Sequence, residues 1–227
     1  MSGSLRVSLQ LGLLLLMMAV IVASFLSPVP QPANGEASRI IFYHVPMAWL
    51  AAMAYTVNMV YAIRYLRKRE PLDDWRSSWS AQLGLAFAIL ATISGSIFAK
   101  VTWHTYWNWG EPRMLSIFIL LLIYGAYFSL RTALTDPERR ATLSSVYSLF
   151  AFPTMIFLIF VFPRIMPQSL HPRDTVINEK LQSGMGPVVM WIFFVSLFCF
   201  TVIYFWLFVL GNRLHRIQVK REMENAL

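Results

Sequence analysis

The sequence predicts an all-α integral membrane protein, built as a bundle of six transmembrane helices. Of its 227 residues, 57% are hydrophobic and only 13% are charged, and the mean hydropathy is +0.57. The apolar residues form six long uncharged stretches, and lysine and arginine gather in alternate loops between them. This composition excludes a soluble globular domain, and we expect residues 1–227 to form a single membrane domain.

Each of the six stretches is long enough to cross a hydrocarbon core of about 30 Å, which takes roughly 20 helical residues. They span residues 7–26, 40–63, 77–99, 114–130, 141–163 and 185–212. Each is expected to be helical, because a bilayer offers no partner to an unpaired backbone group. The first is interpreted as a retained span, since its apolar part is longer than that of a signal peptide and no clear cleavage site follows it.

Prolines predict three local features of these spans. The proline-rich segment 27–38 is expected to be an extended connection. Pro46 is tolerated best in a first turn, so the regular part of the second helix is predicted to begin near it. Pro153 predicts a kink or local unwinding in the fifth helix.

The distribution of cationic residues predicts the orientation. The side that holds both termini and the loops 64–76 and 131–140 carries 13 of the 19 lysines and arginines, and the other side carries 6. The positive-inside rule therefore places both termini in the cytoplasm. The net charge of +8 follows from this topology, and no separate basic block indicates nucleic acid as a partner. The single cysteine, Cys199, excludes an intrachain disulfide and a cysteine-based metal site.

The outward loop 100–116, between the third and fourth spans, concentrates large aromatic side chains. Trp103, Trp107 and Trp109 lie there with Tyr106 and His104. Flat side chains of this size are stable in a loop when a membrane surface, a partner or a planar ligand covers them. Two interpretations stay open, an aromatic belt at the headgroups and a binding surface for a planar ligand.

Three histidines, His44, His104 and His171, fall on the same predicted outer side. Each could have an ordinary role, in a hydrogen bond between helices or as a polar loop residue. Together with the aromatic loop they fit haem, whose iron takes axial imidazoles, whose ring stacks on aromatic faces and whose propionates need cations. The cations available there are Lys100, Arg113, Arg164 and Arg173.

No zinc motif, nucleophile–base pair or phosphate-cradling glycine loop accompanies these residues in the sequence. We therefore expect a protein that binds its ligand and performs no chemical catalysis of its own.

The same residues carry a resemblance to a known family. Residues 39–48, RIIFYHVPMA, resemble the RIxxxHVPxA segment of the CcmC family of haem-handling proteins. Residues 100–116 resemble the tryptophan-rich WWD domain of that family, and Ser169-Leu170-His171 matches its second external histidine. The resemblance runs from about Arg39 to Pro187.

The resemblance implies a bacterial inner-membrane protein of c-type cytochrome maturation, which holds haem b on the periplasmic face and delivers it to the chaperone CcmE. It also implies association with the ABC-transporter subunits CcmA and CcmB and with the small subunit CcmD. On the family pattern, His44 and His171 are the axial ligands of the iron. The aromatic platform then comprises Trp103, Tyr106, Trp107 and Trp109.

The tryptophan loop departs from the family pattern at the position of the acidic residue. Where the family reads Trp-x-Trp-Asp-x-Arg, this chain has Gly110 at the usual aspartate and Glu111 one place later, and Tyr106 replaces a usual tryptophan. We include Glu111, Arg113 and Lys100 among the predicted haem-site residues.

Two other function classes stay open. A membrane cytochrome of the b type, which transfers electrons, places histidine pairs at both sides of the membrane, whereas the candidate ligands here lie on one side. A permease whose outer aromatics form only a belt needs polar or ionisable groups near the midplane, and the spans hold almost none. Both comparisons favour haem delivery.

Overall fold

The computed structural model describes residues 3–171 and 185–225, which form a helical bundle without strands. Within these residues, six helical segments are long and apolar enough to cross a membrane, which confirms the predicted all-α membrane fold. The elements are α1 (Gly3–Leu26), the 3₁₀ helix η1 (Pro32–Ile40), α2 (Ile41–Lys68), α3 (Pro71–Trp103), α4 (Pro112–Ala133), α5 (Pro137–Ile156), the π-helix η2 (Phe157–Val161), α6 (Phe162–Ile165) and α7 (Pro187–Asn225).

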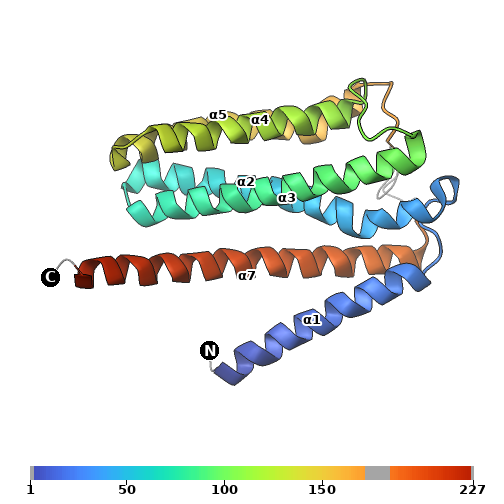
Figure 1. Cartoon of the computed structure of the whole chain (residues 1–227), viewed down its shortest axis with the longest axis horizontal. Coiled ribbons are helices and arrows are strands. Elements are labelled where there is room, and N and C mark those ends of the chain that lie inside the picture. Colours follow the sequence, from blue (N-terminus) through green and yellow to red (C-terminus); the bar gives the residue numbers. More distant parts are fainter. Residues whose placement is uncertain (1–2, 172–184, 226–227) are drawn as a thin grey trace.

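The helices form layers, as Figure 1 shows. α4 and α5 lie on one side of the α2–α3 pair, and α7 lies on the other side. α1 packs against α7 and diverges from the bundle towards its own N-terminus. α1 begins and α7 ends at the same end of the bundle, in agreement with an even number of crossings.

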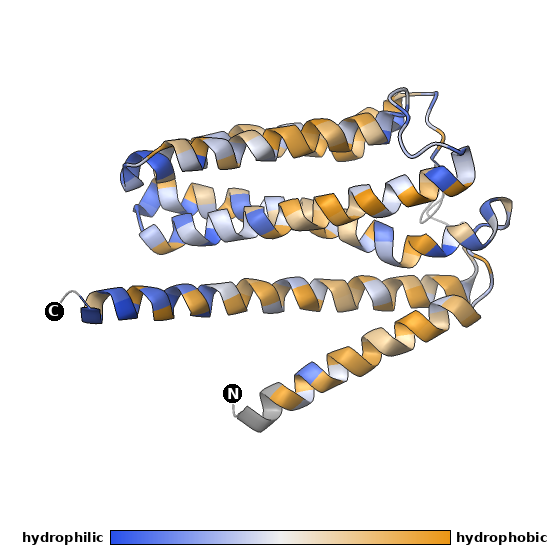
Figure 2. Ribbon diagram, in the orientation of Figure 1, coloured by the Kyte–Doolittle hydropathy of each residue, from blue (hydrophilic) through white to orange (hydrophobic). Residues whose placement is uncertain are grey.

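Several helices extend beyond the predicted apolar stretches. α3 begins at Pro71 and α7 continues to Asn225, so charged residues at the end that holds both termini are also helical. Figure 2 shows apolar residues along the middle of the bundle and hydrophilic residues gathered at that end. An apolar stretch marks only the part of a helix that crosses the hydrocarbon, so it underestimates the length of the helix.

The closest helix pair is α2 with α3, and small residues permit this approach. The buried face of α3 repeats small side chains at helical spacing, namely Ser77, Ser80, Ala81, Gly84, Ala88 and Ala91. Small residues let helix backbones approach in a membrane, where apolar side chains gain little by leaving lipid. The ring of Tyr55 in α2 lies directly over Gly84 and stacks on Tyr124 of α4 at 3.5 Å between centroids.

Hydrogen bonds between helices satisfy polar groups inside this pair. Asn58 donates to Ser77 Oγ at 2.8 Å, and the Ser77 hydroxyl donates to the Asn58 carbonyl at 2.9 Å. Ser80 Oγ donates to the Ala54 carbonyl at 2.6 Å and lies 2.8 Å from the hydroxyl of Tyr204 in α7. These side chains are buried, so the bonds fix the rotation of α2, α3 and α7 about their axes.

The prediction that the second helix begins near Pro46 was wrong. α2 begins at Ile41, and Pro46 lies inside it. A proline there cannot donate to the carbonyl four residues earlier, which belongs to Phe42. The hydroxyl of Ser196 in α7 donates to that carbonyl instead, so a neighbouring helix supplies the missing donor.

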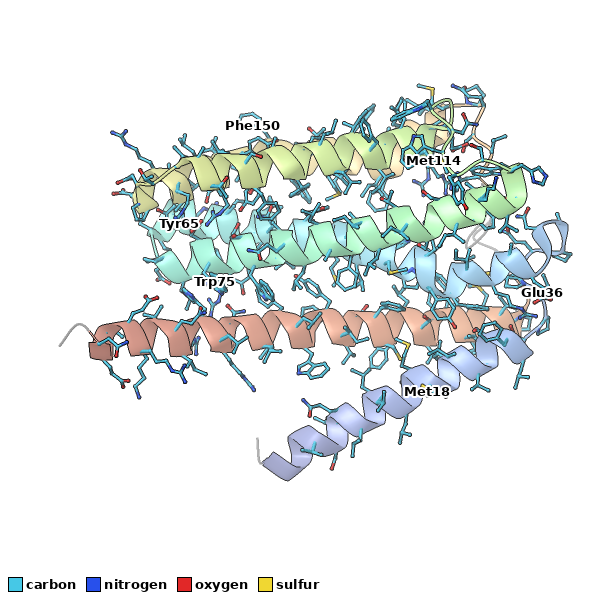
Figure 3. The ribbon with its side chains drawn as sticks, viewed as in Figure 1. Met18, Glu36, Tyr65, Trp75, Met114 and Phe150 are labelled. Atoms are coloured by element: carbon cyan, nitrogen blue, oxygen red, sulfur yellow. The ribbon has the colours of Figure 1, made fainter. Side chains whose placement is uncertain are left out.

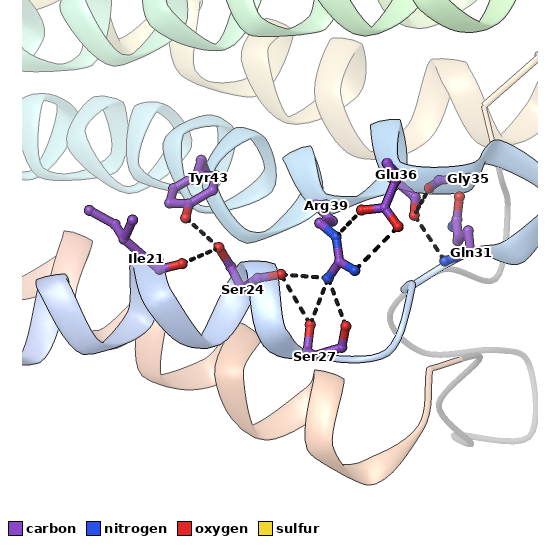
Figure 4. Close-up of polar contacts among 9 residues, drawn as sticks. Ile21, Ser24, Ser27, Gln31, Gly35, Glu36, Arg39 and Tyr43 are labelled. Atoms are coloured by element: carbon purple, nitrogen blue, oxygen red, sulfur yellow. Dashed lines mark hydrogen bonds and ion pairs between the residues drawn. The ribbon is translucent and has the colours of Figure 1, made fainter.

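The connection after α1 is also not extended as predicted, because η1 occupies Pro32–Ile40 as two short 3₁₀ segments with a kink at Gly35, whose φ is 55°. Arg39 holds this 3₁₀ helix against α1, as Figure 4 shows. Its Nη1 donates to the carbonyls of Ser24 and Ser27 at 2.6 and 2.8 Å, and its Nε contacts the Glu36 carboxylate at 2.5 Å. The guanidinium thereby satisfies carbonyls that the end of α1 leaves without a partner.

The fifth span does change its helical geometry, although beyond Pro153. α5 runs through Pro153 to Ile156, and the chain then widens into the π-helix η2 before α6 begins at Phe162. Pro163 has no amide hydrogen for the carbonyl of Ile159, and one wider turn is a common way to accommodate such a loss.

We expect Gly84→Ala to destabilise the protein by about 1–3 kcal/mol, because a Cβ at this position would lie 2.6 Å from the Tyr55 ring. Gly125→Ala in α4 is the matched control, since a Cβ there has nothing within 4 Å. It should be neutral or slightly stabilising. Thermal unfolding of the purified variants in one detergent checks this, and equal midpoints would contradict close α2–α3 packing at Gly84.

Candidate functional site

The predicted site residues gather at the end of the bundle opposite both termini. The first turns of α2 and α4, the end of α3, the loop 104–111 and the segment 166–171 meet there. In Figure 3, Glu36 and Met114 are labelled at this end. Most of the predicted outer loop 164–184, with Arg173, lies outside the described residues.

A buried carboxylate, that of Glu111, joins the tryptophan loop to the segment that carries His171. Glu111 is only 1% exposed. Its carboxylate accepts hydrogen bonds from the Ser169 hydroxyl at 2.8 Å, the Leu170 amide at 2.6 Å and His171 Nδ1 at 3.0 Å. The convergence of these three donors on one carboxylate fixes the position of one loop relative to the other.

The pKa of Glu111 shows that these bonds favour its charged form. Burial acts to raise this pKa, but the hydrogen bonds from His171, Leu170 and Ser169 outweigh burial and lower it to about 2 from 4.5. The charged form therefore stabilises the fold fully above pH 4.5, and this contribution is lost as the pH falls towards 2. At neutral pH the carboxylate is ionised.

The local sequence explains why Glu111 can hold this position. Glu111 is the N-cap of α4, and Pro112 follows at the first helical position, where its missing amide hydrogen costs nothing. The Glu111 carboxylate also accepts from the Arg113 amide at 3.3 Å. The start of α4 thus fixes the backbone of Glu111 and leaves its carboxylate aimed at the segment 169–171.

The imidazole of His171 is oriented by two neighbours. Nδ1 donates to the ionised Glu111, and the ring meets Trp103 edge to face at 5.1 Å between centroids. No described residue bonds Nε2. A carboxylate that accepts from one ring nitrogen fixes the tautomer and leaves the lone pair on the other nitrogen. Metal-binding histidines are commonly held in this way.

His44, in the first turn of α2, has a corresponding arrangement. Its Nδ1 lies 3.0 Å from Ser94 Oγ of α3. The Ser94 hydroxyl has two carbonyl acceptors, Leu90 at 2.9 Å and Ala91 at 3.1 Å, which favours His44 Nδ1 as the donor to Ser94 Oγ and leaves the lone pair on Nε2. Gly95 leaves space for this ring, because a Cβ there would lie 2.9 Å from His44 Cε1.

His171 and Arg113 both lie within electrostatic range of the His44 imidazole. The two imidazoles come from segments far apart in sequence. Among the described residues no three His, Cys, Asp or Glu side chains form a metal cluster. Two imidazole lone pairs are what a porphyrin-bound iron requires, because the macrocycle supplies the other four nitrogens.

The aromatic residues separate into three groups. Trp103 contacts His171, whereas Trp107 and Trp109 meet each other at 5.6 Å, and Trp109 packs on Phe118 of α4 at 5.1 Å. Tyr106 lies under Lys100, 5.3 Å from its Nζ. Trp109 and Tyr106 are both 61% exposed, so they present flat surface outward.

Two buried donors in this region have no acceptor among the residues that the structure describes. They are Trp107 Nε1 and Arg113 Nε. A buried donor without a partner is costly, and a carboxylate ligand would satisfy both. The donor set therefore fits the propionates of haem, with Arg113 as the cation. Arg164 is engaged elsewhere, since its Nη1 donates to the Phe160 carbonyl at 2.5 Å.

His104 has a structural position that the sequence did not suggest. It ends α3 with a left-handed backbone (φ 60°), and its carbonyl accepts from Lys100 Nζ at 3.3 Å. Ser94 and Gly95 were not among the predicted site residues, because serine and glycine in an apolar segment carry no chemical signal by themselves.

Comparison with known proteins identifies similar sequences over this region. Residues 1–226 match the model of the CcmC family, described as Heme exporter protein C. Heme exporter protein C of Bradyrhizobium diazoefficiens is 36% identical over 116 residues, which cover 51% of this chain and 44% of the relative. The protein of the same name from Rhodobacter capsulatus is 29% identical over 150 residues, covering 64% of this chain and 60% of the relative.

A mitochondrial relative matches over more of the chain. A Marchantia polymorpha protein named as a putative cytochrome c biosynthesis ccmC-like mitochondrial protein is 27% identical over 192 residues, covering 83% of this chain and 78% of the relative. The matches to the two bacterial relatives above span only about half of their length.

We predict that Glu111→Gln weakens the attachment of the His171 segment, because the neutral amide cannot accept all the bonds that the carboxylate accepts. Loss of bonds to a charged group corresponds to about 1.5–3 kcal/mol. Thermal unfolding and haem retention of the purified variant measure the effect. Gly110→Ala is the control, since its Cβ would meet only Asn108 Oδ1 at 3.3 Å. Identical behaviour of the two variants would show that Glu111 does not orient His171.

Proposed function

The chain belongs to the CcmC family, and from this membership we propose that it binds haem b at the periplasmic face of the bacterial inner membrane and delivers it to a haem chaperone during c-type cytochrome maturation. Family membership and the six membrane-spanning helices support a multi-pass membrane protein that handles haem. Haem is the cargo in this proposal, and the protein performs no catalysis on it.

One observation carries the proposal. His44 and His171 come from separate segments, and each has its Nδ1 within hydrogen-bond distance of a neighbour, Ser94 Oγ for His44 and the Glu111 carboxylate for His171. A histidine whose Nδ1–H donates to such a neighbour keeps the lone pair of Nε2 for a metal, which is how metal-binding histidines are commonly oriented.

The other residues of the site have distinct roles in this proposal. Arg113 and the Trp107 indole hold propionate oxygens, and Trp103 covers the His171 imidazole. The exposed rings of Tyr106 and Trp109, with Lys100 above Tyr106, form the outer surface on which a CcmE-like chaperone docks. Aromatic side chains of this type dominate the contact energy of protein interfaces.

The partners follow from the family and remain part of the proposal. We expect the chain to assemble with ABC-transporter subunits like CcmA and CcmB and with a small subunit like CcmD. Lipid-facing apolar side chains cover much of α1 and α7, including Phe25 and Trp191, so these helices offer surface to lipid or to other subunits.

We expect the purified protein to show the spectrum of low-spin haem b with two imidazole ligands. His44→Ala and His171→Ala should each give a high-spin spectrum or lose haem, because one face of the iron would lack its ligand. His104→Gly is the control, since glycine suits the left-handed backbone at this position. Unchanged spectra in both ligand variants would overturn the axial assignment.

The orientation has a separate test in a Cys199→Ser background. Ala33→Cys, in η1, should react with an impermeant thiol reagent in intact cells. Thr135→Cys, between α4 and α5, should react only after the cells are opened. The opposite pattern would place the haem site in the cytoplasm and exclude delivery to a periplasmic chaperone.

A further inference from the structure

A second binding feature lies at the opposite end of the bundle, which the positive-inside rule places at the cytoplasmic side. Residues of α2, α3, α4, α5 and α7 line a cavity of about 810 Å³ there. In Figure 3, Tyr65 and Trp75 mark this end. None of its lining residues belongs to the candidate haem site, so the cavity has no role in the function proposed above.

The walls of the cavity are aromatic on one part and cationic on another. Tyr65, Trp75 and Phe128 supply the rings, and Arg69, Arg131 and Arg140 supply the cations. The rings of Trp75 and His215 are stacked at 4.2 Å between centroids, which fixes the Trp75 side chain against α7. Such a site suits a ligand with an anionic head and an apolar body.

Only some of the cations in the wall are paired with a carboxylate of the protein. Arg131 forms an ion pair with Asp74 through two hydrogen bonds of 2.7 and 2.9 Å. Arg69 donates to the neutral hydroxyl of Thr142 at 2.6 Å. Within the described part of the chain, neither Arg69 nor Arg140 forms an ion pair, and Glu138 is the one other carboxylate in the cavity wall.

Two donors in the wall, Trp75 Nε1 and Arg140 Nε, are buried and have no acceptor among the described residues. A buried donor without a partner costs its desolvation penalty, so an acceptor that reached it from the cavity would be stabilised there. Indole and guanidinium groups only donate, and they therefore call for a ligand whose oxygens only accept. A phosphodiester is such a group.

We propose that this cavity binds the phosphate headgroup of an anionic phospholipid, such as phosphatidylglycerol. Arg69, Arg140 and the Trp75 indole hold the phosphate oxygens, while Tyr65 and Phe128 contact the upper part of the acyl chains. The position is that of a headgroup, since the hydrophilic end of the bundle begins there in Figure 2. Basic pockets between transmembrane helices on the cytoplasmic side commonly bind anionic lipids.

The test uses the full chain purified in micelles with equal amounts of phosphatidylglycerol and phosphatidylcholine, and native mass spectrometry of the retained lipid. We expect the wild-type protein to retain phosphatidylglycerol over phosphatidylcholine by about ten-fold or more. A ratio of this size corresponds to the loss of about one hydrogen bond to a charged group. Arg69→Gln with Arg140→Gln should abolish this preference. The matched control is Arg67→Gln with Arg139→Gln, which removes the same charge from residues outside the cavity.

Three results would overturn the proposal: no preference in wild type, equal loss in both double variants, or displacement of the lipid by millimolar inorganic phosphate. The first two would reduce the effect to general surface charge, and the third would mean that the site binds a free anion. If the Arg69→Gln/Arg140→Gln variant does not fold, Trp75→Phe replaces it, because it removes one donor and keeps the charge. It should lower the preference several-fold, and an unchanged preference would count against the site.

Discussion

The close contact of α2 with α3 is the constraint on which the other helices depend. Small side chains along α3 bring the two backbones together, and Asn58, Ser77 and Ser80 exchange hydrogen bonds across the contact. α5 and α7 pack on this pair, and Tyr55 of α2 stacks on Tyr124 of α4. The same stripe of small residues ends at Gly95 beside His44, so the packing that builds the core also positions one imidazole.

At the end of the bundle that holds the candidate site, hydrogen bonds to a charged group, and not helix packing, hold the segment 169–171 in place. The segment that carries His171 is attached through the single carboxylate of Glu111, which is buried and ionised because several donors converge on it. The two histidines are thus held differently, one by a rigid helix pair and one by a loop. A carrier that must both hold and release its cargo gains from such asymmetry, because a loop moves at lower cost than a packed helix.

The bilayer explains how the chain tolerates its prolines. Pro46 leaves the Phe42 carbonyl without an amide, and in hydrocarbon that carbonyl would have no water to accept from. Ser196 of α7 donates to it, while Arg39 does the same for carbonyls at the end of α1. The donor from α7 is distant in sequence from Phe42, whereas Arg39 bonds the end of the helix that precedes it.

The sequence alone determined the number of spans and the helical class and predicted most residues of the candidate site, because hydrophobic length and residue chemistry are local properties. His44, His171, Glu111 and the tryptophans were all recognisable as residue types in a recurring order. The tertiary structure decided which of them meet: Glu111 with His171, Ser94 with His44, and Trp103 apart from Trp107 and Trp109. It also decided where α2 begins, since the Ser196 hydroxyl that donates to the Phe42 carbonyl comes from α7, and a contact between such distant segments leaves no periodic signal in either segment.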